Sequence, residues 1–115
     1  MKGNFYNLKE RTFEFALKIL EVAAMLPKTT EGDIIQRQLI KAGTSIGANV
    51  EEADGVSTKA DFVSKLTIAR KEAKETSYWL RLIARKFIKS DTIETNIKEC
   101  AELIRIFSSI INKTR

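Results

Sequence analysis

Residues 42–49 read AGTSIGAN, and they lie inside a long helical pattern although they contain two of the five glycines of the chain. Each glycine costs a helix interior roughly 1 kcal/mol relative to alanine. Gly43 and Gly47 stand four residues apart, so they share one helix face, where a missing side chain lets another backbone approach. The alternative, a helix break, conflicts with the apolar periodicity that continues through both glycines. We therefore expect this face to pack closely against the third or fourth helix of the chain, or against a neighbouring subunit.

Outward from this stretch, apolar residues recur at steps of three and four, which indicates amphipathic helices. Four segments follow this rule, at about residues 7–26, 31–54, 58–88 and 91–113. The most regular stripe lies in the third segment and consists of Phe62, Leu66, Ala69, Ala73, Thr76, Leu80, Ile83 and Phe87. Such spacing is typical of antiparallel helices that cross at small angles. The sequence predicts an all-α, antiparallel up-down-up-down four-helix bundle that forms a single domain over residues 1–115.

The composition fits a globular protein rather than a membrane protein. The chain has 115 residues, of which 43% are hydrophobic and 30% charged, and its net charge is +5. Its apolar runs are all shorter than the ~20 residues that a membrane-spanning helix needs, and its N-terminal residues lack a signal-peptide pattern. A single cysteine, Cys100, has no partner for an internal disulfide, as is usual in a reducing compartment. We expect a cytoplasmic protein without membrane contact.

The residue types present argue against most catalytic and metal-binding chemistry. The chain contains no histidine, which excludes Ser-His and Cys-His nucleophile systems and the commonest ligands of zinc and iron. Phosphate-binding glycine loops are also absent. Cys100 falls on the apolar stripe of the fourth segment and is expected to be an inert core thiol. An enzyme that uses Glu52, Glu72 or Glu75 is the weakest hypothesis, and we predict no catalytic residue, metal or cofactor.

Charged and polar side chains border the apolar stripes of the second and third segments. If the turn between these segments is centred at Val56 and Ser57, Lys41 lies opposite Glu72, and Arg37 lies opposite Glu75 or Thr76. The pattern predicts a structural polar layer that fixes the register of the two helices. Its expected members are Arg37, Lys41, Asn49, Glu52, Glu72 and Glu75. A ligand or catalytic site built from these groups is the less favoured interpretation.

Basic residues form a stripe on the outer face of the third segment. Arg70, Lys74, Arg81 and Arg85 share one face with Tyr78, and Lys86 and Lys89 lie nearby. From Arg70 to Lys89 a helix would span about 28 Å. Such a stripe is suited to tracking a phosphate backbone, and an aromatic ring among guanidinium groups is suited to stacking on a base. The alternative is a solvated surface or a face that contacts another subunit.

Residues 37–82 also carry a family resemblance. Residues 37–53 read RQLIKAGTSIGANVEEA, and DF, KLTIARKEA, ET and YWL follow at 61–62, 65–73, 75–76 and 78–80. These blocks resemble the four-helix-bundle family also called 23S rRNA-intervening-sequence proteins, and they are similar to the accessory variability proteins of diversity-generating retroelements. The resemblance implies a small bacterial subunit without enzymatic activity that forms a homopentamer. By the retroelement likeness, it also implies nucleic acid and a reverse transcriptase as partners.

Two functional hypotheses therefore stand ahead of the enzyme. The first is a homopentameric protein that binds nucleic acid, RNA in preference to DNA, through the basic stripe. The second is a structural oligomer or adaptor that binds a protein partner and has no nucleic-acid role. Independently of the resemblance, several apolar residues lie off the main stripes, and such a surplus commonly marks a subunit interface. These residues are Phe13, Val63, Trp79, Ile88 and Ile110.

Overall fold

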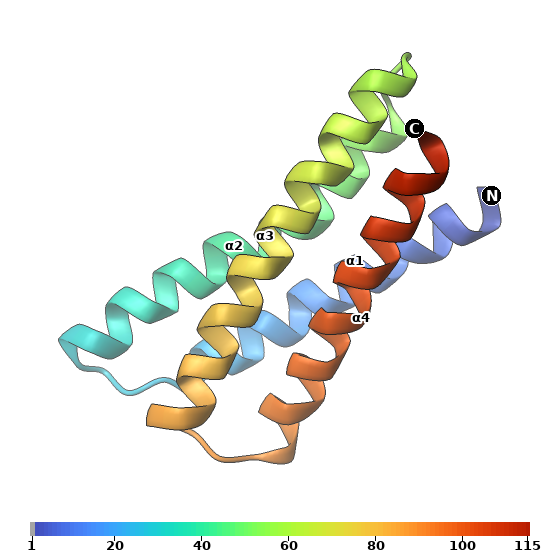
Figure 1. Ribbon diagram of the computed structural model, residues 1–115. Coiled ribbons are helices and arrows are strands. Elements are labelled where there is room, and N and C mark those ends of the chain that lie inside the picture. Colours follow the sequence, from blue (N-terminus) through green and yellow to red (C-terminus); the bar gives the residue numbers. More distant parts are fainter. Residues whose placement is uncertain (1) are drawn as a thin grey trace.

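A computed structural model describes residues 2–115 of the backbone, with the side chains of residue 5 and residues 7–115. Four helices follow one another: α1 (Lys2–Ala24), α2 (Thr30–Asp54), α3 (Lys59–Lys86) and α4 (Asp91–Thr114). They run alternately up and down in a bundle that measures 44 × 23 × 19 Å (Figure 1). The predicted all-α antiparallel bundle is confirmed.

Hydroxyl side chains cap the N-termini of α2, α3 and α4. Thr29, Thr58 and Ser90 each accept a hydrogen bond from the backbone N–H three residues later, which satisfies a donor that has no partner within the helix. The helix bounds differ from the predicted ones mainly in α1, which begins at Lys2 rather than near residue 7. Helix α3 ends at Lys86, so Lys89 belongs to the connection to α4.

The core consists of the apolar stripes that the periodicity indicated. Leu66, Ala69, Ala73, Leu80 and Ile83 of α3 are fully buried. The aromatic rings at the two ends of the stripe, Phe62 and Phe87, are only half-buried because the bundle opens toward its ends. Within the described residues, no buried side-chain nitrogen or oxygen lacks a hydrogen-bond partner.

The two glycines of residues 42–49 do meet another helix closely, but that helix is α1 rather than α3 or α4. A Cβ atom on Gly43 would lie 2.6 Å from Cγ2 of Ile19, and one on Gly47 would lie 3.3 Å from the carbonyl oxygen of Thr12. The spacing of glycines marks a face of close approach, but it contains no information about which helix fills that face. Gly32, which the sequence analysis did not single out, is still tighter, because its Cβ would collide with the carbonyl oxygen of Pro27.

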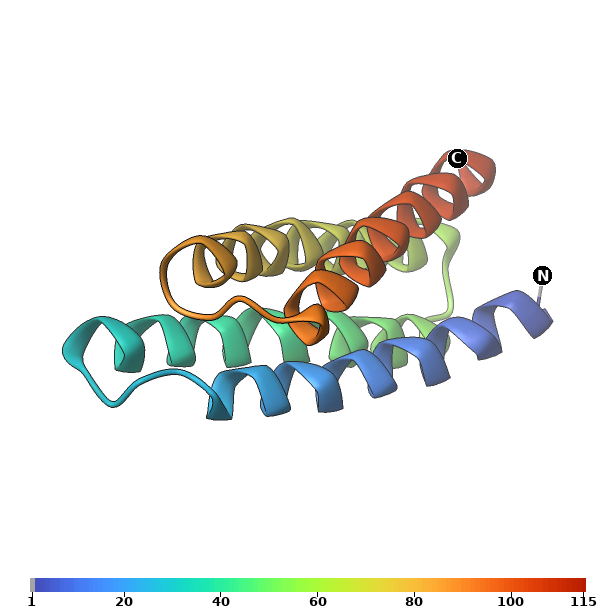
Figure 2. The same ribbon diagram turned by 90° about the horizontal axis from the view of Figure 1, so that it is seen from below.

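Helix α1 packs along α2 but separates from α4 toward the N-terminal end of α1 and the C-terminal end of α4. Both views show these two ends diverging (Figures 1 and 2). Contacts between α1 and α4 are accordingly far fewer than those between any other neighbouring pair of helices. The bundle therefore has one open seam.

The apolar residues outside the core stripes are arranged differently from the expectation. Phe13 is 58% exposed, as expected, whereas Val63, Trp79, Ile88 and Ile110 are half-buried against the core. Their side chains are long or branched enough to reach the core from the edges of the helices. Exposed apolar side chains gather instead on α1, where Leu17 and Leu20 join Phe13.

Candidate nucleic-acid interface

The predicted basic stripe occupies the outer face of α3. Basic side chains outnumber acidic ones eight to three along this helix. Lys74, Arg81 and Arg85 are exposed, whereas Arg70 is half-buried because its Nη1 donates a hydrogen bond of 3.2 Å to Oγ of Ser108 on α4. Lys86 and Lys89 are exposed at and beyond the end of α3. The stripe is therefore continuous over the helix, and it is anchored to α4 at one end.

The cations of this face are not neutralised by carboxylates. Lys9, Arg11, Lys65 and Arg105 form ion pairs elsewhere in the molecule. Among the described residues, no ion pair involves the basic members of the α3 face: Arg70, Lys74, Arg81, Arg85, Lys86 and Lys89. The side chain of Arg81 hydrogen-bonds, among the residues that the structure describes, only within its own helix, with Nε 3.3 Å from the carbonyl oxygen of Ser77 and 3.4 Å from its Oγ. The exposed members, Lys74, Arg81, Arg85, Lys86 and Lys89, face solvent and are available to an anion.

An aromatic pair lies among the cations. Tyr78 is 52% exposed, and its ring meets the ring of Trp79 edge-on, with centroids 5.0 Å apart and an interplanar angle of 75°. The indole Nε1 of Trp79 donates to Oε2 of Glu75 at 3.1 Å. Glu75 and Trp79 thus buttress Tyr78, whose exposed ring offers a surface on which a flat group can stack.

A shallow hollow of about 460 Å³ between α3 and α4 adjoins this pair. Tyr78, Arg81 and Arg85 line it from α3, and Glu94 and Ile97 line it from α4. Ser108, Glu94 and Ile97 were not predicted to join the basic stripe, because they belong to a helix whose register against α3 is set by packing. Glu94 is the single acidic residue among those that line the hollow, against two arginines.

The expected polar layer between α2 and α3 is reduced to one ion pair. Nζ of Lys65 lies 2.7 Å from Oε1 of Glu52. Arg37 and Lys41 point outward and are exposed, and within the described residues neither is paired with Glu72 or Glu75. Both cations stay in water, because burying them in a contact with α3 would carry a desolvation cost that an ion pair does not always repay. The amide Nδ2 of Asn49 donates within α2 to the carbonyl oxygen of Ser45 at 2.8 Å, so Asn49 does not bridge the helices.

Cys100 and the acidic residues are the remaining candidates for chemistry in the part of the chain that the structure describes. Cys100 is buried and its thiol donates to the carbonyl oxygen of Ala73 at 3.1 Å. Burial raises the pKa of this thiol to about 12, so the nucleophilic thiolate is not populated at neutral pH. In the described part of the chain, His, Cys, Asp and Glu side chains nowhere gather in a group of three that would hold a metal ion. No described helix has a stretch that is long and apolar enough to cross a membrane.

Comparisons with known proteins address the family rather than the site. The family model described as 23S rRNA-intervening sequence protein matches residues 6–109. A crystal structure of a protein of unknown function from the S23 ribosomal protein family of Bacteroides thetaiotaomicron superimposes with a TM-score of 0.83. The two sequences are 37% identical, and the match covers 90% of this chain and 97% of that one. No curated protein sequence matches the chain. With the family model spanning all four helices, this chain belongs to the 23S rRNA-intervening sequence protein family.

Proposed function

We propose that this protein is a non-enzymatic, homo-oligomeric RNA-binding protein that contacts phosphates through the outer face of α3. The observation that carries the proposal is the row of exposed cations without carboxylate partners along that helix, of which Lys74, Arg81 and Arg85 are the centre. Lys and Arg side chains in such a row neutralise phosphates and release condensed counterions. Helix α3 rises about 24 Å from Arg70 to Lys86, which is long enough to follow several phosphates.

RNA is preferred to duplex DNA because of Tyr78. Its ring is exposed beside Arg81, and unpaired bases of RNA loops stack on aromatic rings and guanidinium planes. Bases inside a DNA duplex are already stacked on one another and do not reach such a ring. The description of the family as 23S rRNA-intervening sequence proteins favours the same choice.

A homopentamer is the assembly that we propose from the family resemblance. The exposed apolar side chains of α1 support self-association, because a contiguous exposed apolar surface commonly marks an interface. A ring would repeat the basic face five times and strengthen a weak contact through avidity.

Binding is best measured as a function of salt. Fluorescence anisotropy gives the affinity at each salt concentration. The two labelled probes are an RNA hairpin with a single-stranded loop and a DNA duplex of equal length. We expect log affinity to fall linearly with log salt concentration, with a slope of about −0.7 to −0.9 per phosphate contact. Arg81→Glu/Arg85→Glu should weaken binding to all sequences and flatten this slope.

The matched control is Arg37→Glu/Lys41→Glu, which changes the net charge equally on the exposed face of α2. This control should retain most of the affinity and the slope. Tyr78→Ala should weaken binding to the looped RNA by roughly 10- to 100-fold, in line with 1–3 kcal/mol per stacked base, and should leave the duplex unaffected. If the α3 variant and the control lost affinity equally, net charge alone would explain the effect, and the outer face of α3 would be rejected as the binding site.

A structural adaptor is the second candidate, and the apolar part of the hollow beside Tyr78 favours it. Leu82, Ala84 and Ile97 line this hollow together with the arginines, and an acidic protein segment with apolar side chains would suit the combination. Absence of RNA and DNA binding at low salt would reject the nucleic-acid proposal in favour of this one.

A further inference from the structure

We infer that the exposed apolar stripe of α1 in one copy docks into the open groove between α1 and α4 of the next copy. The stripe consists of Phe13, Leu17 and Leu20, which are 58%, 43% and 43% exposed. Their spacing of four and three residues places them on one face of α1. This inference rests on the proposed self-association and specifies the surfaces that join.

A row of carboxylates borders the stripe. Glu10, Glu14 and Glu21 are exposed and share the neighbouring strip of the helix surface. Within the described residues, none of the three forms an ion pair. The stripe therefore has the pattern of an amphipathic helix with an apolar ridge and an acidic edge, which is unsuited to phosphates or to an anionic lipid surface.

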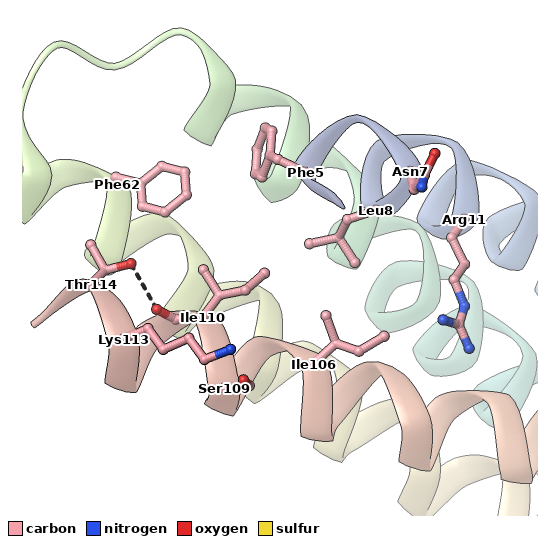
Figure 3. A pocket seen from close by; sticks show the side chains of 10 residues that line it. All are labelled: Phe5, Asn7, Leu8, Arg11, Phe62, Ile106, Ser109, Ile110, Lys113 and Thr114. Atoms are coloured by element: carbon pink, nitrogen blue, oxygen red, sulfur yellow. Dashed lines mark hydrogen bonds between the residues drawn. The ribbon is translucent and has the colours of Figure 1, made fainter. Parts of the chain in front are cut away.

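The groove lies at the open seam of the bundle, where α1 and α4 diverge (Figure 3). Its volume is about 580 Å³, and its apolar lining comes from three helices: Phe5 and Leu8 of α1, Phe62 of α3, and Ile106 and Ile110 of α4. The rings of Phe5 and Phe62 meet with centroids 5.4 Å apart and close one end of the groove. An apolar groove of this shape is the usual receptor for a helix that presents residues at steps of three and four.

The edge of the groove complements the edge of the stripe in charge. Lys113 lines the groove and has no ion pair among the described residues. Arg11 lines it as well, held by Glu99 through bonds of 2.7 and 2.8 Å from Nε and Nη2. A free ammonium group beside an apolar groove and free carboxylates beside an apolar ridge make a second copy of this chain the fitting occupant.

The stripe and the groove lie on nearly opposite sides of α1. At about 100° per residue, Leu17 points away from Leu8, which lines the groove. One surface of each copy therefore meets a different surface of the next, which is a heterologous contact. Heterologous contacts generate closed rings or open filaments rather than two-fold dimers.

Disulfide trapping tests this arrangement directly. We would oxidise Leu17→Cys/Ile110→Cys and both single variants, and compare them on non-reducing gels. The double variant should give a ladder of covalent oligomers, and each single variant should remain monomeric. Wild-type protein serves as the control for the native thiol of Cys100, which is buried. Dimers of Leu17→Cys alone would mean that stripe faces stripe and would overturn the inference.

Sedimentation equilibrium separates failure of this interface from failure of self-association. Wild-type protein that sediments as a 13.0 kDa monomer would reject the proposed assembly and this inference with it. If wild type assembles, Leu17→Glu should weaken association by at least about 100-fold, because the docked charge would be buried without a partner. Ala60→Glu, at an exposed position of α3, should have no effect. Assembly of Leu17→Glu as strong as wild type, or monomer bands alone from the double cysteine variant, would place the interface elsewhere.

Discussion

Toward α2, helix α1 lies so close that Gly43 has no room for a methyl group, whereas toward α4 it leaves a groove of about 580 Å³. The first flank is tightly packed because two positions of α2 are glycines. Their missing side chains let Ile19 and Thr12 of α1 approach the backbone of α2. The second flank is lined by large apolar side chains, and a groove nevertheless remains open between them. Apolar periodicity is the same on both flanks, so the difference lies in side-chain volume and in the divergence of the helix axes. Four sets of variants would break or sharpen this contrast.

The largest effect is expected for Gly43→Leu, which places a full side chain where Ile19 already fills the space. Overpacking of a close-packed core costs about 1–3 kcal/mol and more where neither backbone moves aside. We expect a loss of about 3 kcal/mol or more in the free energy of unfolding, measured by urea denaturation. Wild-type stability in this variant would mean that α1 is not packed against Gly43.

Truncation at two points along one face of α4 should differ. Leu103 is fully buried, so Leu103→Ala should cost about 2–5 kcal/mol. Ile110 is half-buried at the groove, so Ile110→Ala should cost about 1 kcal/mol, since less apolar area is lost from the core. Both are compared in a Leu17→Glu background, where association between copies does not contribute. Equal losses would indicate that the seam is closed in the isolated subunit.

Gly43→Ala is a finer probe of the same contact. Alanine favours a helix interior by roughly 1 kcal/mol, but its methyl group would collide with the branched carbons of Ile19. We expect a net loss of about 1–2 kcal/mol by thermal and urea unfolding. Gly55→Ala is the matched control, because the nearest atom to its Cβ, the carbonyl oxygen of Glu52, is 3.8 Å away and its φ of −100° suits alanine. A stabilised Gly43→Ala would show that the close contact is absent.

The smallest effect is expected for the ion pair that spans the open seam. Arg11 and Glu99 are partly exposed, and such pairs contribute about 0.2–1 kcal/mol. Arg11→Gln should lose this amount at low salt, and the loss should vanish in 1 M NaCl because exposed charges are screened. Arg105→Gln removes a more exposed pair within α4 and should cost less than Arg11→Gln. A salt-independent loss in Arg11→Gln would mean that its aliphatic stem, rather than its charge, holds the seam.

Much of the fold followed from the sequence because steps of three and four in apolar residues specify both the helix and its buried face. The stripe from Leu66 to Ile83 is buried as this pattern indicated. The basic face of α3 was predicted from the same geometry, since residues on one helix face share it whatever the rest of the fold does. Partners on other helices were beyond such reasoning: Arg70 of α3 donates to Ser108 of α4, and within the described residues the expected contact between Arg37 and Glu75 is not formed. A register between helices depends on turn geometry and packing, which no periodicity within one helix encodes.

By itself, then, the sequence determined that four amphipathic helices pack through their apolar stripes, that residues 42–49 need a close neighbour, and that α3 carries the positive charge. Tertiary structure decided that α1 is that neighbour, that α1 and α4 diverge, and that Leu17 and Leu20 remain uncovered beside Phe13. The reason is physical: local spacing fixes what each helix surface offers, whereas the choice among surfaces is made by the volumes and angles at which whole helices fit together.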